Sequence, residues 1–138
     1  MPSVLIGEIT EAYKQLSGSH DILVAVRSSA TAEDLPDASF AGQQKTFLNI
    51  SGAEDLVKAV KDGWASLFEP RAIFYRADKK YDHFKVGISI IVQRMIQSEV
   101  SGIMFTVDPL TNNRDRINIE AAYGLGEAVV SGSLTPDQ

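Results

Sequence analysis

The sequence predicts an α+β fold, in which helices and strands mix along the chain and the later strands pair as hairpins. Apolar residues recur at three- and four-residue steps from Val4 to Leu16, which is typical of one face of a helix. Apolar runs at 22–26 and 86–96, the second rich in β-branched residues, are typical of strands. With 138 residues, the chain has the usual size of one domain and is long enough to bury a core.

Each expected element has a local reason. Gly18 is expected to end the first helix, Ser51 to cap the second, and Pro70 to occupy the first turn of the third. In chain order, the expected elements are a helix over 4–16, strands over 22–26 and 46–50, helices after 51 and from 70, strands over 86–96, 102–107 and 117–121, and a short helix or loop around 128–130.

Composition excludes several classes of function. The net charge is −5, from 18 acidic and 13 basic residues, so electrostatics gives no reason to expect nucleic acid or an anionic membrane as a partner. The absence of cysteine excludes disulfides, thiolate metal sites and cysteine nucleophiles. No apolar run is long enough to span a bilayer, and the N-terminus lacks the pattern of a secretory signal. We therefore expect a cytoplasmic protein.

The segment 27–44 carries the strongest functional signal. The apolar run 22–26 ends in Arg27, whose guanidinium offers a planar fork of donors to phosphate oxygens. The hydroxyls and small residues that follow include Ser28, Ser29, Thr31 and Gly42. Together they form a workable phosphate cradle, although the Gly-x4-Gly-Lys-Ser/Thr pattern of a P-loop is absent. The alternative is a surface loop whose arginine pairs with Glu33 or Asp34, and composition alone favours that alternative.

Five blocks of sequence stand out in order along the chain, at 26–44, 66–72, 91–96, 101–109 and 120–127. Together they resemble the nucleotide-binding domain shared by phosphoenolpyruvate synthases, pyruvate phosphate dikinases and rifampicin phosphotransferases. Within the first block, the form Leu35-Pro36-Asp37-Ala38-Ser39-Phe40-Ala41-Gly42 resembles the synthases and the rifampicin enzymes more than the phosphate dikinases. The chain is thus similar to the N-terminal ATP-binding domain of a phosphoenolpyruvate synthase (pyruvate, water dikinase).

The resemblance implies an ATP-grasp-like nucleotide-binding fold, incomplete in this chain, with ATP held between two subdomains. It implies that Arg27 is the catalytic residue on the transferring phosphates. The phosphate-binding residues would be Arg27, Ser28, Ser29, Thr31 and Gly42. The residues that border adenine would be Gln93, Arg94 and Met95. Glu120 would hold ribose or a metal ion, and Glu127 is a second carboxylate candidate for the metal.

Several of these residues have a second interpretation that stays open. Met95 is equally expected as a core residue, because methionine fills apolar gaps. Glu127 is equally expected to cap the helix that follows it. Asp108 is either a ligand contact or a turn residue whose carboxylate bonds its own backbone.

Three polar residues outside these blocks, or at their edges, are expected to have structural roles only. His20 and His83 lack the sequence motif of the family's phosphorylated histidine, so we expect a loop residue and a turn residue without a catalytic role. Arg76 is expected on a solvated helix face, where it would pair with Glu69 or Asp78.

By this resemblance, residues 1–138 are a partial ATP-binding domain, truncated at both ends. The family's glycine-rich segment with a phosphate-binding lysine lies upstream, and its acidic pair for Mg²⁺ lies downstream. The full enzyme would convert ATP, pyruvate and water into AMP, phosphoenolpyruvate and phosphate, through a phosphohistidine on another domain. We expect the chain alone to be inactive. The alternatives are a fragment of a rifampicin phosphotransferase-type enzyme and a stand-alone nucleotide-binding module without catalysis.

Overall fold

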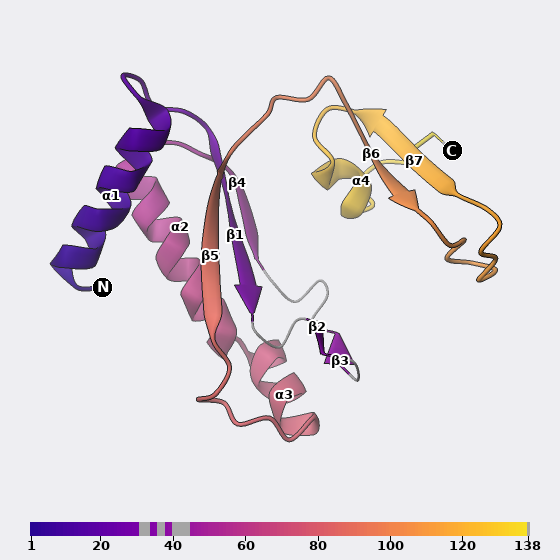
Figure 1. Ribbon diagram of the computed structural model, residues 1–138, viewed down its shortest axis with the longest axis horizontal. Coiled ribbons are helices and arrows are strands. Elements are labelled where there is room, and N and C mark those ends of the chain that lie inside the picture. Colours follow the sequence, from indigo (N-terminus) through magenta and orange to yellow (C-terminus); the bar gives the residue numbers. More distant parts are fainter. Residues whose placement is uncertain (31–33, 36–37, 40–44, 138) are drawn as a thin grey trace. The chain divides into compact units, whose positions relative to one another are not determined.

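The computed structural model describes residues 1–30, 34–35, 38–39 and 45–137 (Figure 1). Helices and strands mix along the chain, which confirms the predicted α+β class. The chain divides into two compact units, Met1–Met95 and Ile96–Gln138, where its length alone suggested one. No helix in the described ranges is long and apolar enough to cross a membrane.

The longer helices and strands of the first unit follow the order expected from the sequence, with boundaries that shift by a few residues. The elements of this unit are α1 (Ser3–Ser17), β1 (Val24–Ala30), β2 (Asp34–Leu35), β3 (Ala38–Ser39), β4 (Thr46–Ile50), α2 (Ala53–Ala65), the 3-10 helix η1 (Ser66–Phe68), α3 (Pro70–Asp78) and β5 (Ile88–Arg94). Of these, β2, β3 and η1 were not predicted. Pro70 occupies the first turn of α3, as predicted, where its missing N–H leaves no hydrogen bond unmade.

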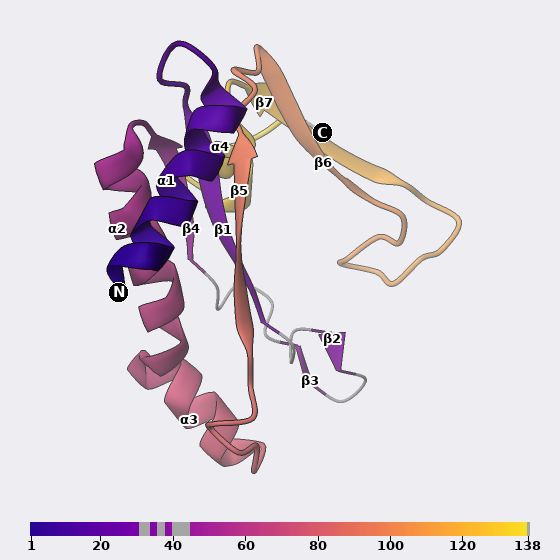
Figure 2. The same ribbon diagram turned by 60° about the vertical axis from the view of Figure 1, so that its left-hand side comes forward.

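The core of the first unit lies between two helices and one face of an antiparallel sheet. The sheet has the order β4-β1-β5, so β1 is its central strand. Val24 and Val26 on β1 are 0% and 1% exposed, and both pack against residues of α1 and α2. Figure 2 shows these two helices on the same side of the sheet. The buried cluster comprises Tyr13, Val24, Val26, Leu56, Ala59 and Val60.

The hydroxyl of Tyr13 joins three parts of this unit. It donates a hydrogen bond to the carbonyl of Ile22 (2.9 Å) and accepts one from the N–H of the same residue (3.2 Å). It also accepts a hydrogen bond from the N–H of Gly52 (3.0 Å), immediately before α2. Because Tyr13 is only 3% exposed, these backbone groups would have little access to water if the hydroxyl were absent.

The start of α2 differs from the prediction. Gly52, and not Ser51, is the residue that precedes the first helical turn. Its φ of 82° lies in the left-handed region, which glycine adopts at little cost. The first turn then carries Glu54 and Asp55, whose negative charges favour the N-terminal end of a helix.

The prediction of a solvated Arg76 is wrong. Its side chain is 0% exposed, its Nε donates a hydrogen bond to Nδ1 of His83 (3.0 Å), and its guanidinium carbon lies 5.8 Å from the centre of the Phe68 ring. Burial lowers the pKa of Arg76. Neither terminal nitrogen has a hydrogen-bond acceptor among the described residues. The carboxylates expected to pair with it pair with lysines: Glu69 with Lys45, and Asp78 with Lys79.

The second unit is built on a hairpin, which confirms the predicted pairing of strands late in the chain. Its elements are β6 (Val100–Phe105), β7 (Asn118–Tyr123) and α4 (Glu127–Val130). The two strands run antiparallel, with Gly102 opposite Ala121. A side chain on Gly102 would place its Cβ 2.6 Å from the carbonyl oxygen of Glu120, so this position requires glycine.

The connection between β6 and β7 contains a turn organised by Asp108. Its Oδ1 accepts hydrogen bonds from the N–H groups of Leu110 (2.9 Å) and Thr111 (3.3 Å). Of the two interpretations that the sequence left open, these bonds support the turn residue. The side-chain hydrogen bond from Thr111, followed by the backbone bond from Leu110, lowers the pKa of the Asp108 carboxyl.

Replacement of Tyr13 by phenylalanine should destabilise the first unit by about 1–3 kcal/mol, because it leaves two backbone N–H groups without their acceptor. Urea denaturation followed by the fluorescence of Trp64, the single tryptophan, measures this change. Tyr81→Phe is the matched control, since the hydroxyl of Tyr81 makes no hydrogen bond with the described residues and should shift stability by less than about 0.5 kcal/mol. Equal effects of the two changes would contradict the role assigned to Tyr13.

The turn around Asp108 should depend on pH. Because the folded pKa of Asp108 lies below the unfolded value of about 3.9, its hydrogen bonds favour the folded turn above that pH. This contribution is lost as the pH falls through the folded pKa. NMR shifts of the Leu110 and Thr111 amides should therefore move together in acid, and Asp108→Asn, which keeps a neutral acceptor, should abolish the transition. If the transition persists in Asp108→Asn but disappears in Asp115→Asn, Asp115 is the group that titrates, and the role given to Asp108 is wrong.

Candidate functional site

Arg27 lies on the face of the sheet opposite to the helices. Side chains alternate along β1, and Val24 and Val26 point toward α1 and α2. Arg27 therefore points to the other face, where its side chain is exposed. No carboxylate among the described side chains pairs with it. Arg27 is the middle residue of β1 and not, as the sequence predicted, the residue that follows the strand. An exposed guanidinium without a described carboxylate partner can offer its donors to phosphate oxygens.

Gln93 shares this face with Arg27. On β5, Gln93 lies opposite Ala25, and Ile91 lies opposite Arg27. On the other side of β1, Thr46 of β4 lies opposite Arg27. Residues directly opposite each other in a sheet point to the same face. The structure thus groups Thr46, Arg27, Ile91 and Gln93 on one face, and we call these four residues the open-face group.

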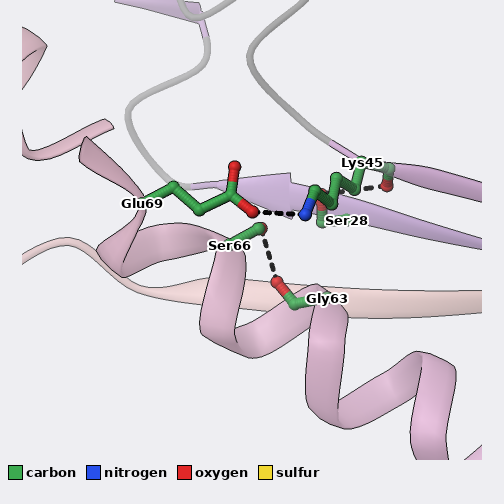
Figure 3. A network of polar contacts seen from close by, with 5 residues as sticks. All are labelled: Ser28, Lys45, Gly63, Ser66 and Glu69. Atoms are coloured by element: carbon green, nitrogen blue, oxygen red, sulfur yellow. Dashed lines mark hydrogen bonds and ion pairs between the residues drawn. The ribbon is translucent and has the colours of Figure 1, made fainter. Parts of the chain in front are cut away.

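Ser28 is not part of the open-face group. It follows Arg27 on the strand, so its side chain points toward the helix-covered side. Its Oγ donates a hydrogen bond to the carbonyl of Lys45 (3.4 Å), and its N–H donates to the same carbonyl (3.4 Å). Figure 3 shows this contact together with the ion pair between Lys45 and Glu69. The phosphate-binding role expected for Ser28 stays a prediction, and in this structure its hydroxyl donates to a backbone carbonyl instead.

The other residues of the expected phosphate cradle are placed only in part. Ser29 lies on the same side of β1 as Arg27, and its carbonyl accepts a hydrogen bond from the hydroxyl of Ser89 on β5 (3.2 Å). Thr31 and Gly42 lie outside the described residues, as do the side chains of Glu33 and Asp34, which the alternative interpretation required.

Arg94 and Met95 close the end of the sheet. Arg94 lies opposite Val24, and its side chain is exposed. The N–H of Met95 donates to the carbonyl of Leu23 (2.9 Å), and its sulfur accepts a hydrogen bond from the N–H of Asn49 (3.0 Å). Asn49 has a φ of 58° where the pairing of β4 with β1 is irregular, so Met95 satisfies an amide that the ladder leaves out. This contact supports a structural role for Met95 beside the expected adenine contact.

The two carboxylates proposed for ribose or metal belong to the second unit. Glu120 lies opposite Ile103 on the hairpin and is half-buried. Glu127 is the first residue of α4, and its side chain is exposed. Within the described part of the chain, no group of three or more histidine or acidic side chains is arranged to hold a metal ion. Neither carboxylate therefore forms a metal site with its described neighbours.

Sequence reasoning missed the pairing of two charged residues near Ser28, Lys45 and Glu69. Their ion pair joins residues 24 positions apart, one immediately before β4 and the other immediately before α3. No local sequence pattern signals such a pair, because its partners meet only when the helices pack on the sheet.

Comparison with known proteins identifies the family. The family model described as pyruvate phosphate dikinase, AMP/ATP-binding domain, matches residues 1–138. The phosphoenolpyruvate synthase of Pyrococcus furiosus is 59% identical over 100% of this chain and 17% of its own length. The probable phosphoenolpyruvate synthase of Methanothermobacter thermautotrophicus is 62% identical over 96% of this chain and 19% of its own length. The phosphoenolpyruvate synthase of Aquifex aeolicus is 56% identical over 95% of this chain and 15% of its own length.

The chain therefore spans less than a fifth of the length of these relatives. The family model matches all 138 residues of the chain. The chain belongs to the family of the pyruvate phosphate dikinase AMP/ATP-binding domain.

Proposed function

We propose that this chain forms part of the ATP site of a phosphoenolpyruvate synthase, with Arg27 as the residue that contacts the transferring phosphates. The observation that carries the proposal is the exposed guanidinium of Arg27 on the helix-free face of the sheet, anchored by the buried valines of the same strand. A guanidinium held in this way presents paired donors to phosphate oxygens without a large change in conformation. The family membership supplies ATP as the ligand.

Gln93 is the second residue that the proposal places against the nucleotide. It lies on β5, on the same face as Arg27 and two residue pairs further along the sheet. Its exposed amide offers both a donor and an acceptor, which suits recognition of a base edge or a ribose hydroxyl. Thr46 and Ile91 flank Arg27 on the neighbouring strands, so the face combines a hydroxyl, an apolar surface and a cation.

In the longer protein, the proposed reaction converts ATP, pyruvate and water into AMP, phosphoenolpyruvate and phosphate by way of a phosphohistidine on another domain. Arg27 would stabilise the negative charge on the phosphoryl oxygens as the bond to the leaving group lengthens. Thr31 and Gly42 would contribute to the same cradle. Arg94 and Met95 would border adenine from the end of the sheet, since Arg94 lies opposite Val24 and does not belong to the open-face group. The names of the relatives favour a synthase over the rifampicin phosphotransferase that the sequence left open.

The described residues do not fit a Mg²⁺ site by themselves, since Glu120 and Glu127 have no acidic partners arranged around a common point. We assign no step of the reaction to the metal on the strength of this chain. The proposed division of labour is that the chain supplies Arg27 and part of the nucleotide face, while further segments complete the site. The chain alone should therefore bind ATP weakly and produce no phosphoenolpyruvate.

A segment exchange tests the proposal. The matching segment of the Pyrococcus furiosus enzyme is replaced by this chain, and ATP-dependent formation of phosphoenolpyruvate is measured. The exchanged enzyme should be active, and Arg27→Ala within it should lower kcat by at least about 100-fold, as expected for loss of a charge-stabilising donor. Arg71→Ala, which removes an exposed arginine on α3, is the matched control and should leave kcat within about twofold.

Two results would contradict the proposal. One is an active exchanged enzyme whose turnover and ATP affinity survive Arg27→Ala. The other is calorimetric titration of the 138-residue chain with Mg-ATP that gives low-micromolar affinity, since that would show that the further segments contribute little to the site.

A further inference from the structure

The ion pair between Lys45 and Glu69 lies next to Ser28, the residue that follows Arg27 on β1. The carbonyl of Lys45 accepts both hydrogen bonds that Ser28 donates, and its ammonium pairs with the carboxylate of Glu69 (Figure 3). The side chains of the pair are 48% and 36% exposed, so neither charge is buried. One residue thus connects Ser28, through its backbone, to the start of α3, through its side chain.

Glu69 is itself held in place by the helical layer. Its N–H donates to the carbonyl of Ser66 (3.2 Å), and its own carbonyl accepts from the N–H of Ile73 in the first turn of α3 (3.0 Å). The hydroxyl of Ser66 in turn donates to the carbonyl of Gly63 in α2 (2.6 Å). The backbone of Glu69, from which the carboxylate extends to Lys45, is therefore held at the junction between α2 and α3.

The hydrogen bonds between Ser28 and Lys45 are long. The paired residues of β1 and β4 end at Arg27 and Thr46, and both bonds from Ser28 to the carbonyl of Lys45 are 3.4 Å long, beyond the usual ranges of about 2.7–3.2 Å for N–H···O and 2.5–3.0 Å for O–H···O. The ion pair with Glu69, which holds Lys45 near the start of α3, therefore supports the long hydrogen bonds between Ser28 and Lys45. Because Arg27 is covalently joined to Ser28, fixing Ser28 on the helix side limits the directions in which Arg27 can point on the opposite side.

We propose that Lys45 and Glu69 are positioning residues, whose ion pair orients Arg27 toward the nucleotide by fixing Ser28. The inference rests on the proposed ATP site. The ammonium of Lys45 is paired with Glu69 before α3 and with no described group on the face that carries Arg27. Its effect on the nucleotide is therefore transmitted through Ser28 and the backbone of β1.

Amide hydrogen exchange of the 138-residue chain tests the positioning step without any ligand. Lys45→Met and Glu69→Gln should each accelerate exchange of the Ser28 amide by about two- to fivefold, the range expected for loss of an exposed ion pair, and leave the Val26 amide unchanged. The exchanged pair Lys45→Glu with Glu69→Lys should restore the original rate. Lys79→Met, which removes the partner of Asp78 elsewhere on α3, is the control and should change neither amide.

The functional step is tested by titrating the same variants with Mg-ATP. Lys45→Met should raise Kd by about two- to fivefold, the charge exchange should restore it, and Arg27→Ala should abolish measurable binding. A role in overall stability alone would lower Tm and accelerate the Val26 and Ser28 amides equally, which would overturn the inference. So would a faster Ser28 amide with unchanged Kd.

The two proposals fail in different ways. If the unaltered chain binds no ATP, or if Arg27→Ala binds it normally, the ATP site is wrong in this chain, and the exchange rates still decide whether the ion pair fixes Ser28. If ATP binding depends on Arg27 but the Ser28 amide does not respond to Lys45→Met, the ATP site stands and the positioning pair is wrong.

Discussion

The burial of Val24 and Val26 against α1 and α2 is the constraint on which the candidate site depends. Side chains of a strand point alternately to its two faces. Once Val24 and Val26 are buried on one face, the face of each remaining residue of β1 is determined. Arg27 is thereby excluded from the core and directed to the open side of the sheet. The same alternation on β5, where Ile90 and Val92 pack against the core, directs Gln93 to the same side as Arg27. A shift of one residue in this packing would bury the guanidinium and expose the valines.

The parts of the fold that could be predicted are those in which local sequence and tertiary packing agree. The apolar run before Arg27 forms the central strand, the periodic apolar residues near the N-terminus form α1, and Pro70 begins α3. The prediction failed for Arg76, because the identity of an arginine gives no indication that Phe68 and His83 will enclose it. The prediction that Ser51 caps α2 failed because the residue before the helix has a positive φ, which Gly52 adopts at little cost.

The candidate site was predicted less completely than the fold, for a physical reason. The sequence identified a run of residues able to bind phosphate, but side chains that follow each other on a strand point in opposite directions. The side chains of Arg27 and Ser28 therefore point to opposite sides of the sheet, although they are neighbours in the motif. The structure groups Arg27 with Gln93, which lies 66 positions further along the chain, and gives Ser28 a contact with Lys45. The match to an AMP/ATP-binding domain indicates the class of ligand, whereas strand geometry decides which side chains share one face.

The buried guanidinium of Arg76 has a consequence for how this region tolerates change. A charge removed from water is acceptable only while its surroundings compensate for the lost hydration, and among the described side chains this compensation comes from one imidazole nitrogen and one aromatic ring. The effect of a substitution at position 68, 76 or 83 therefore depends on the residues present at the other two positions. Loss of the imidazole or the ring strands the cation, whereas replacement of all three by apolar residues of similar volume removes the charge and its requirements together. If positions 68, 76 and 83 changed one at a time in evolution, an intermediate would contain a buried and uncompensated guanidinium, unless Arg76 was replaced first.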